Sequence, residues 1–227
     1  MKIPFKEARL RPLIGGYLKY SGMFRLLYRH TATTEISSRY YYAVWMRHLH
    51  YISKFYYLKT PFKILEIGPG DSLGVGLAAL FSGANCYYGI DIINYLNCQL
   101  NLKIFDELVT LFKSRTCIPD EKEFPVLRPI VNNYGFPHDI LTDDLLEFTM
   151  NKERLESIRL ELINPYNVNN KYIRVFIPWS KNTLIESNSI DIIMSQAALQ
   201  SVQGLDNIYE AMKLWIKPGG LMSHTID

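Results

Sequence analysis

Lys63-Ile-Leu-Glu-Ile-Gly-Pro-Gly-Asp-Ser72, followed by Tyr87-Tyr-Gly-Ile-Asp91, decides the fold of this chain. The first stretch predicts a short apolar strand that breaks into a Gly-Pro-Gly turn, then a helix over 72–81. The second predicts a strand that ends on the carboxylate of Asp91. Glycines let a backbone approach a ligand, the helix N-terminus offers unpaired N–H groups, and the distal acid meets ribose hydroxyls. This arrangement indicates the nucleotide-binding half of a doubly wound α/β sheet.

Other segments bear on which nucleotide is bound. Glu66 places an acid at the end of the first strand. Residues 190–202, Ile-Asp-Ile-Ile-Met-Ser-Gln-Ala-Ala-Leu-Gln-Ser-Val, predict a strand and its loop, and 208–220 predict a helix that ends in a Lys-Pro-Gly-Gly turn. Together with the glycine motif, these segments resemble the class I S-adenosylmethionine (SAM)-dependent methyltransferases. The resemblance covers about 63–92 and 172–227.

The resemblance implies a Rossmann-like, doubly wound and mainly parallel sheet with strand order 3-2-1-4-5. We expect a helical cap over 1–60 and a SAM-binding core over 61–227, with a helical insertion at about 100–165. The family normally adds two strands after the fifth, and this chain apparently lacks them, so the fifth strand should be an exposed edge. Exposed edges invite pairing with another chain, which leaves a homodimer open. The strands are expected near 63–67, 86–91, 172–177, 190–195 and 220–226.

The resemblance also implies the cofactor, SAM, with S-adenosylhomocysteine as its product. Gly68 and Gly70 should shape the turn beside the methionine part, and Glu66 should lie near its amino group. Asp91 should accept both ribose hydroxyls, with Ile92 beside the adenine. The remaining cofactor residues expected are Pro69, Asp71, Ser72, Trp179 and Ser195.

Three departures from the family pattern are visible. Ser72 replaces the third glycine; its small side chain still allows close approach and can cap the helix. Leu199-Gln-Ser-Val202 stands where many relatives have Leu-Glu-His-Val, so an imidazole near the acceptor is missing. The third strand, Tyr172-Ile-Arg-Val-Phe-Ile-Pro-Trp179, offers no acid for the adenine amino group, which leaves Trp179 or Ser180 as adenine neighbours.

A helix is expected at about 36–57, capped by Thr33 or Thr34. Its aromatic stripe is either a packing face or a cap over the acceptor pocket, with Arg39 and tyrosine hydroxyls facing a polar substrate. The insertion, with helices expected at 100–114 and 142–162, is either a lid or a decoration. The acceptor site is expected to contain Arg39, Tyr42, Trp45, His138 and Gln196.

Catalytic residues are hard to identify, because methyl transfer needs mainly alignment and exclusion of water. An oxygen acceptor would benefit from a general base. His224 is the preferred candidate, since it lies at the C-terminal edge of the fifth strand and strand ends face the crevice. The acidic cluster of Asp139, Asp143 and Asp144 lacks the spacing of a metal site, so no metal is expected.

The distribution of charge limits the classes of molecule that the chain is expected to bind. The net charge of +3 conceals a segment, 1–63, in which twelve Lys and Arg stand against two Glu, a net of +10. This segment is either a solvated helical face, or it favours an acidic acceptor such as a phosphorylated or uronic-acid compound, or it contacts an anionic surface. The basic residues are dispersed and form no recognised nucleic-acid module. A small-molecule acceptor is therefore expected, and no nucleic acid.

The three cysteines, Cys86, Cys98 and Cys117, show no CxxC spacing, which is typical of a reduced, cytoplasmic protein. No apolar run approaches the ~20 residues of a membrane span. The sequence thus predicts a SAM-dependent methyltransferase that acts on a small polar, possibly acidic acceptor. Two alternatives stay open: a SAM-binding fold without turnover, and an NAD(P)-dependent Rossmann enzyme, against which the Lys217–Gly220 turn argues.

Overall fold

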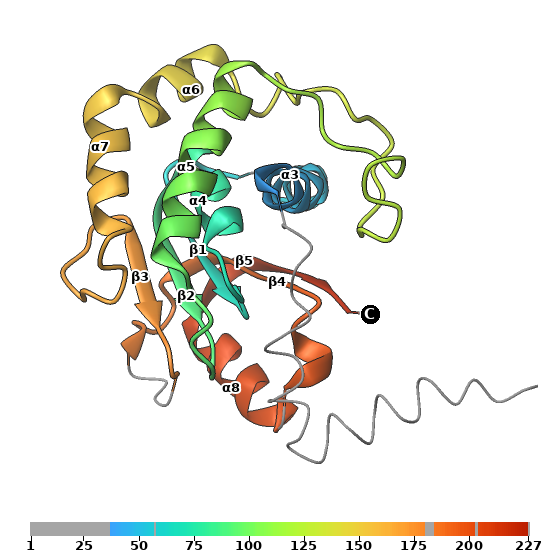
Figure 1. Cartoon of the computed structure of the whole chain (residues 1–227). Coiled ribbons are helices and arrows are strands. Elements are labelled where there is room, and N and C mark those ends of the chain that lie inside the picture. Colours follow the sequence, from blue (N-terminus) through green and yellow to red (C-terminus); the bar gives the residue numbers. More distant parts are fainter. Residues whose placement is uncertain (1–36, 57, 180–183, 203, 227) are drawn as a thin grey trace, which may run out of the picture. The chain divides into compact units, whose positions relative to one another are not determined.

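The computed structural model describes residues 37–56, 58–179, 184–202 and 204–226. Its sheet has five parallel strands in the order β3-β2-β1-β4-β5, which confirms the predicted order (Figure 1). The fold is Rossmann-like. The order reverses between β1 and β4, so a crevice opens beyond the carboxyl ends of these strands. The strands are β1 Phe62–Ile67, β2 Ala84–Ile90, β3 Ile173–Phe176, β4 Ile190–Gln196 and β5 Ile216–Thr225.

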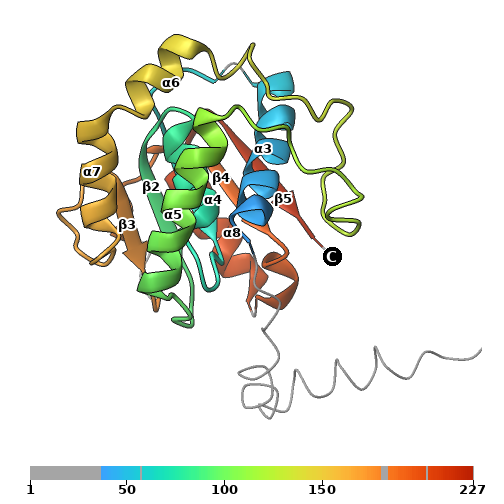
Figure 2. The same cartoon turned by 45° about the horizontal axis from the view of Figure 1, so that its top comes forward.

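Helices cover both faces of the sheet unequally. Figures 1 and 2 show α3, α4 and α5 over one face and α8 over the other. The larger buried cluster lies between the sheet and α3, α4 and α5, and the smaller one under α8. The helices are α3 Ser38–Phe55, α4 Gly74–Phe81, α5 Cys98–Lys113, α6 Asp143–Thr149, α7 Lys152–Glu161 and α8 Leu205–Trp215.

Helix α3 is the predicted aromatic helix, and its stripe is a packing face. Tyr41, Trp45, His48 and Ile52 are all buried, as their helical spacing predicts. The Trp45 indole donates a hydrogen bond to Ser82 Oγ at 2.8 Å, which satisfies its only polar atom in the core. The proposed caps Thr33 and Thr34, and the first 36 residues of the expected helical cap, lie outside the described residues.

The insertion between β2 and β3 holds α5, α6 and α7. The helix expected over 142–162 is two helices, because Asn151 caps α7 by accepting a hydrogen bond from Arg154 N–H at 2.9 Å. The irregular part is anchored on α3 by Arg47, whose buried guanidinium donates to the carbonyls of Leu127 at 2.6 Å and Pro119 at 2.7 Å. The insertion therefore packs against the helical layer of the core.

Strand β5 begins earlier than predicted, because the Lys-Pro-Gly-Gly turn is a bulge inside the strand. Ile190 pairs with Ile216 and Ile192 with Leu221, so Asp191 alone faces the bulge at 217–220. The Asp191 carboxylate accepts hydrogen bonds from Lys217 Nζ and from Lys63 N–H, both at 2.7 Å. Asp191 thus joins β1, β4 and β5. Within the described residues, β5 pairs only with β4 and forms an edge of the sheet.

Candidate functional site

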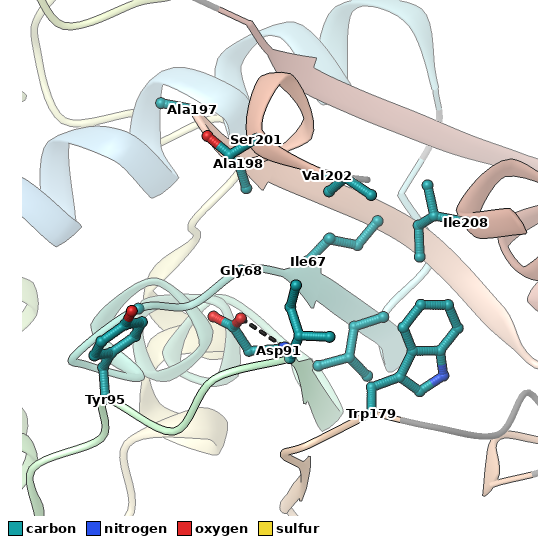
Figure 3. A pocket seen from close by; sticks show the side chains of 13 residues that line it. Ile67, Gly68, Asp91, Tyr95, Trp179, Ala197, Ala198, Ser201, Val202 and Ile208 are labelled. Carbon is teal, nitrogen blue, oxygen red and sulfur yellow. Dashed lines mark hydrogen bonds between the residues drawn. The ribbon is translucent and has the colours of Figure 1, made fainter. Parts of the chain in front are cut away.

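A cavity of about 290 Å³ opens at the carboxyl ends of β1, β2 and β4. Figure 3 shows Tyr95 at one end, Trp179 at the other, and the Asp91 carboxylate between them. This is the crevice position that the reversal of strand order predicts. Its lining consists of Ile67, Gly68, Gly70, Ile90, Asp91, Ile92, Tyr95, Trp179, Ala197, Ala198, Ser201, Val202 and Ile208.

The glycine turn forms one wall of the cavity. Gly68 and Gly70 have φ angles of +73° and +70°, which L side chains rarely adopt. A Cβ at Gly68 would lie 2.6 Å from Ala198 Cβ, so the loop after β4 touches the turn there. A Cβ at Gly70 would meet nothing within 4 Å, so the backbone at Gly70 is open to a ligand.

The turn is held from behind by Asn101 of α5. Asn101 Oδ1 accepts hydrogen bonds from Ser72 Oγ at 3.0 Å and from Leu73 N–H at 2.8 Å. Ser72 Oγ in turn accepts from Gly74 N–H at 3.1 Å, and α4 begins at Gly74, two residues later than predicted. Ser72 is buried and does not line the cavity, so its side chain shapes the turn rather than facing a ligand.

Asp91 is the charged side chain of the lining. Its Oδ1 accepts hydrogen bonds from the N–H groups of Ile92 at 2.7 Å and Ile93 at 3.3 Å. Partial burial raises the pKa of the carboxyl, and the backbone N–H groups of Ile93, Ile92 and Gly70 oppose that rise. The carboxylate is therefore oriented by the backbone and presented to the cavity (Figure 3).

Trp179 closes one end of the cavity. Its backbone N–H donates to Asp91 O at 2.7 Å, and its ring packs edge-on against Trp215 with the centroids 5.7 Å apart. Across the described part of the chain, its buried Nε1 finds no hydrogen-bond partner. Ile92 also belongs to the lining. This end is flat and apolar; Ser180, the alternative adenine neighbour, lies outside the described residues.

Glu66 lies beneath the turn and not in the lining. It is buried, and Tyr87 donates a hydrogen bond to its Oε2 at 2.7 Å. Burial raises the pKa of Glu66 to about 7; the Tyr87 hydrogen bond opposes the shift and the nearby Asp91 adds to it. The structure therefore places this acid one layer below the cavity wall. Pro69 and Asp71 belong to the turn but are also absent from the lining.

Polar side chains at the ends of β4 and β5 pair with one another. His48 of α3 lies 2.7 Å from Ser223 Oγ through Nδ1 and 3.1 Å from Gln196 Oε1 through Nε2. Burial lowers the pKa of His48 to about 4, so the ring is neutral near pH 7. On the other face, Ser195 Oγ lies 2.9 Å from His224 Nδ1.

His224 keeps one nitrogen without a partner. Its Nε2 is buried and has no hydrogen-bond partner in the described ranges. Burial also lowers the pKa of His224, which favours the neutral ring. Neither His224 nor Gln196 lines the cavity, but Gln196 directly precedes Ala197 and Ala198, which do. Gln196 is therefore next to the lining in the chain, and His224 is linked to it only through the pairing of β4 with β5.

Four residues expected at the acceptor site, Arg39, Tyr42, Trp45 and His138, do not line the cavity. Arg39 forms an ion pair with Glu123 of the insertion, Nε to Oε1 at 2.6 Å, so its charge is already matched. Tyr42 and Trp45 are fully buried in the core. His138 is exposed on the insertion and packs on a neighbouring ring. His48 and Ser223, by contrast, come together near the ends of β4 and β5 only through folding, and no local sequence signal predicts their contact.

Two absences concern the described residues only. No three His, Cys, Asp or Glu side chains among them gather in a way that could hold a metal ion. No helix among them is both long and apolar enough to cross a membrane. The insertion, as far as the structure describes it, also contributes nothing to the cavity lining.

No family model matches the chain, and no curated protein matches it. Among solved structures, a candidate SAM-dependent methyltransferase of Methanococcus maripaludis is 11% identical with a TM-score of 0.40, over 99% of this chain and 68% of that one. Haemonchus contortus phosphoethanolamine N-methyltransferase 2, in complex with SAM, is 16% identical with a TM-score of 0.38, over 86% of this chain and 34% of that one. The same enzyme in complex with phosphomonomethylethanolamine and S-adenosylhomocysteine is 16% identical with a TM-score of 0.38, over 85% of this chain and 34% of that one. Similarity this distant carries no argument about function.

Proposed function

We propose that the chain binds SAM in the cavity and transfers its methyl group to a small polar acceptor. The observation that carries this proposal is the Asp91 carboxylate, which ends β2 and faces a cavity walled by the glycine turn. A carboxylate in that place suits the two hydroxyls of a ribose. The residue pattern of the turn, acid before and acid after, adds to the same conclusion.

The cavity residues fit the three parts of SAM. Trp179 and Ile92 offer apolar surface to an adenine, and Asp91 offers acceptors to the ribose. Gly68 and Gly70, the residues of the turn that line the cavity, have no side chains, so a methionine moiety can lie against their backbone. The order of these features along the cavity, adenine end, carboxylate, glycine turn, supports SAM over a ligand without a ribose diol.

SAM supplies a methyl group on a sulfonium. The acceptor lone pair forms the new bond to the methyl carbon, the carbon–sulfur bond breaks with its electron pair going to sulfur, and an oxygen or nitrogen acceptor gives up a proton. We assign the acceptor side to the ends of β4 and β5. There Gln196 is oriented by His48, and the neutral His224 ring has an unpartnered Nε2, within the described residues, that can accept the proton.

One observation favours a second candidate, a SAM-binding protein without turnover. Both ring nitrogens of His48 are already occupied by Ser223 and Gln196, and His224 is partly tied to Ser195.

An acidic acceptor has lost its main support, because Arg39 is neutralised by Glu123. The acceptor is therefore proposed only as small and polar.

Titration calorimetry with SAM, S-adenosylhomocysteine and NADPH tests the cofactor. We expect the two adenosyl compounds to bind and NADPH to give no heat; binding of NADPH alone would point to the nicotinamide alternative. For turnover, radiolabelled SAM is incubated with pools of small hydroxy and amino compounds. Transfer that is lost in His224→Asn while SAM affinity persists supports the enzyme, and binding without transfer to any pool supports the second candidate.

A further inference from the structure

Asp71, directly after the glycine turn, is held in place on two sides. Its Oδ1 accepts a hydrogen bond from the Tyr41 hydroxyl of α3 at 2.9 Å. Its backbone carbonyl accepts from Asn97 N–H at 3.2 Å, on the segment that follows the lining residue Tyr95. Tyr41 is buried against the same turn, since a Cβ at Gly74 would lie 2.4 Å from the Tyr41 ring. The carboxylate therefore has a fixed orientation.

No cation of the described residues forms an ion pair with Asp71. The carboxyl group is half-buried rather than buried, and its Oδ2 is not among the enclosed atoms that lack a partner. The Tyr41 hydroxyl donates a hydrogen bond to the Asp71 carboxylate. Burial and the neighbouring Asp71 both raise the pKa of Tyr41, which keeps that proton in place. One oxygen of Asp71 is thus fixed by Tyr41 and the other is accessible.

The chemistry of SAM requires a partner for a cation near the turn, because its methionine end carries an ammonium group. Three carboxylates surround the glycine turn, and two are already accounted for. Asp91 lies midway along the cavity, where the ribose is proposed to bind. Glu66 is buried below the wall, bonded to Tyr87, with a pKa raised to about 7, so near neutral pH it is only partly charged. Asp71 is the remaining one; it is absent from the lining, as Glu66 is, but it is half-buried rather than buried and adjoins Gly70, whose backbone does line the cavity.

We propose that Asp71 binds the ammonium group of the methionine moiety and that Tyr41 positions the Asp71 carboxylate for it. This rests on the proposed function, because the site exists only if SAM binds in this cavity. It moves the ammonium partner from Glu66, where the family resemblance places it, to the half-buried acid that directly follows the glycine turn. It also gives α3 a role in binding the cofactor, which the packing of its aromatic stripe does not require.

Two ligands separate this role from general support of the cavity: S-adenosylhomocysteine, and its deamino analogue, which lacks only the ammonium group. Calorimetry measures both on the wild type and on the isosteric Asp71→Asn. We expect Asp71→Asn to bind S-adenosylhomocysteine about tenfold more weakly, a typical loss for one charge-assisted hydrogen bond. The deamino analogue should lose less than about twofold. Equal losses for the two ligands, or none, would overturn the assignment of Asp71.

Tyr41→Phe tests the positioning role, with Tyr51→Phe as its matched control. Tyr51 lies on the same helix and its hydroxyl donates to Ile130 O at 2.7 Å, so both variants lose one tyrosine hydrogen bond. We expect Tyr41→Phe to bind S-adenosylhomocysteine about three- to tenfold more weakly than the wild type. Its affinity for the deamino analogue, and the affinity of Tyr51→Phe for both ligands, should be unchanged. Equal behaviour of the two variants refutes the role of Tyr41. If the wild type binds neither ligand, the proposed function itself fails, a result distinct from both.

Discussion

The two halves of the sheet's carboxyl edge use polar side chains in opposite ways. On the β1–β2 half, Asp91 is oriented by backbone N–H groups and stays open to the cavity. On the β4–β5 half, Gln196 pairs with His48 and Ser195 pairs with His224. A group that is fixed by the backbone keeps its side-chain acceptors for a ligand, whereas paired side chains must exchange partners before they can bind one.

Each half also buries one ionisable side chain and disfavours its charged form. Glu66 lies under the glycine turn with a pKa raised to about 7, and His48 lies behind the β4–β5 end with a pKa lowered to about 4. Desolvation is the largest cause in both, and it acts in opposite directions because it disfavours the charged form of each. The two halves should therefore respond oppositely to pH.

The largest expected effect is on cofactor affinity. Asp91→Ala removes the acceptor of two ribose hydroxyls, and each hydrogen bond to a charged group contributes about 1.5–3 kcal/mol, so SAM affinity should fall at least about 100-fold. Gln196→Ala, on the β4–β5 half, should change it less than about twofold. Calorimetry on both variants measures the contrast. Similar losses from the two substitutions would show that the cofactor spans both halves equally.

The next largest expected effect is that of Glu66 on the pH dependence of the free energy of unfolding. Between the unfolded pKa of about 4.3 and the folded value of about 7, the folded state keeps a proton that the unfolded chain has released, so raising the pH favours unfolding. Wild type should lose about 1–3 kcal/mol relative to Glu66→Gln between pH 4.5 and 7. Urea unfolding across this range measures it. A constant difference between the two proteins would mean that Glu66 is ionised in the fold.

His48 should change the free energy of unfolding by a similar amount, but in the opposite direction with pH. Its folded pKa is about 4, while an unfolded histidine titrates near 6.5, so lowering the pH through this window favours the unfolded, protonated chain. Wild type should lose about 1–3 kcal/mol relative to His48→Gln as the pH falls from 6.5 to 4. His50→Gln, on a half-exposed site of the same helix, is the control and should follow the wild type. A parallel course for His48→Gln would contradict the expectation.

The smallest effect separates the two glycines of the turn. Alanine at either Gly68 or Gly70 must adopt a positive φ, which costs about 1–2 kcal/mol. Only Gly68→Ala also meets Ala198, at 2.6 Å, so it should be less stable than Gly70→Ala by about 1 kcal/mol or more. Thermal unfolding of the pair tests this. Equal melting temperatures would mean that the loop after β4 can move away from the turn.

The fold could be predicted because its signals are local. The glycine turn, the carboxylate at Asp91 and the apolar strands each lie within a few residues, and their order fixes the topology. The errors are local too. Asn151 splits a predicted helix by capping its second half, and β5 starts early because its Lys-Pro-Gly-Gly turn folds as a bulge against Asp191.

The acceptor side could not be predicted in the same way, because its contacts join distant residues. Arg39 looked available for a substrate, yet Glu123, 84 positions away, neutralises it. His48 has the helical spacing of the buried stripe of α3, and nothing near it in the sequence shows that Gln196, 148 positions on, becomes its partner. Asp91 and Gly70, by contrast, were predicted for the cofactor and do line the cavity, although their contact with SAM stays a prediction.

Helix α3 has a consequence that follows from its three attachments. Within about two turns, Tyr41 reaches the glycine turn, Arg47 reaches the insertion and His48 reaches β4 and β5. One helix thus contacts both the proposed cofactor side and the proposed acceptor side. If an acceptor bound at His48 shifts α3, it also changes the affinity for the cofactor at Asp71. By thermodynamic linkage, the cofactor must then change affinity for the acceptor by the same factor.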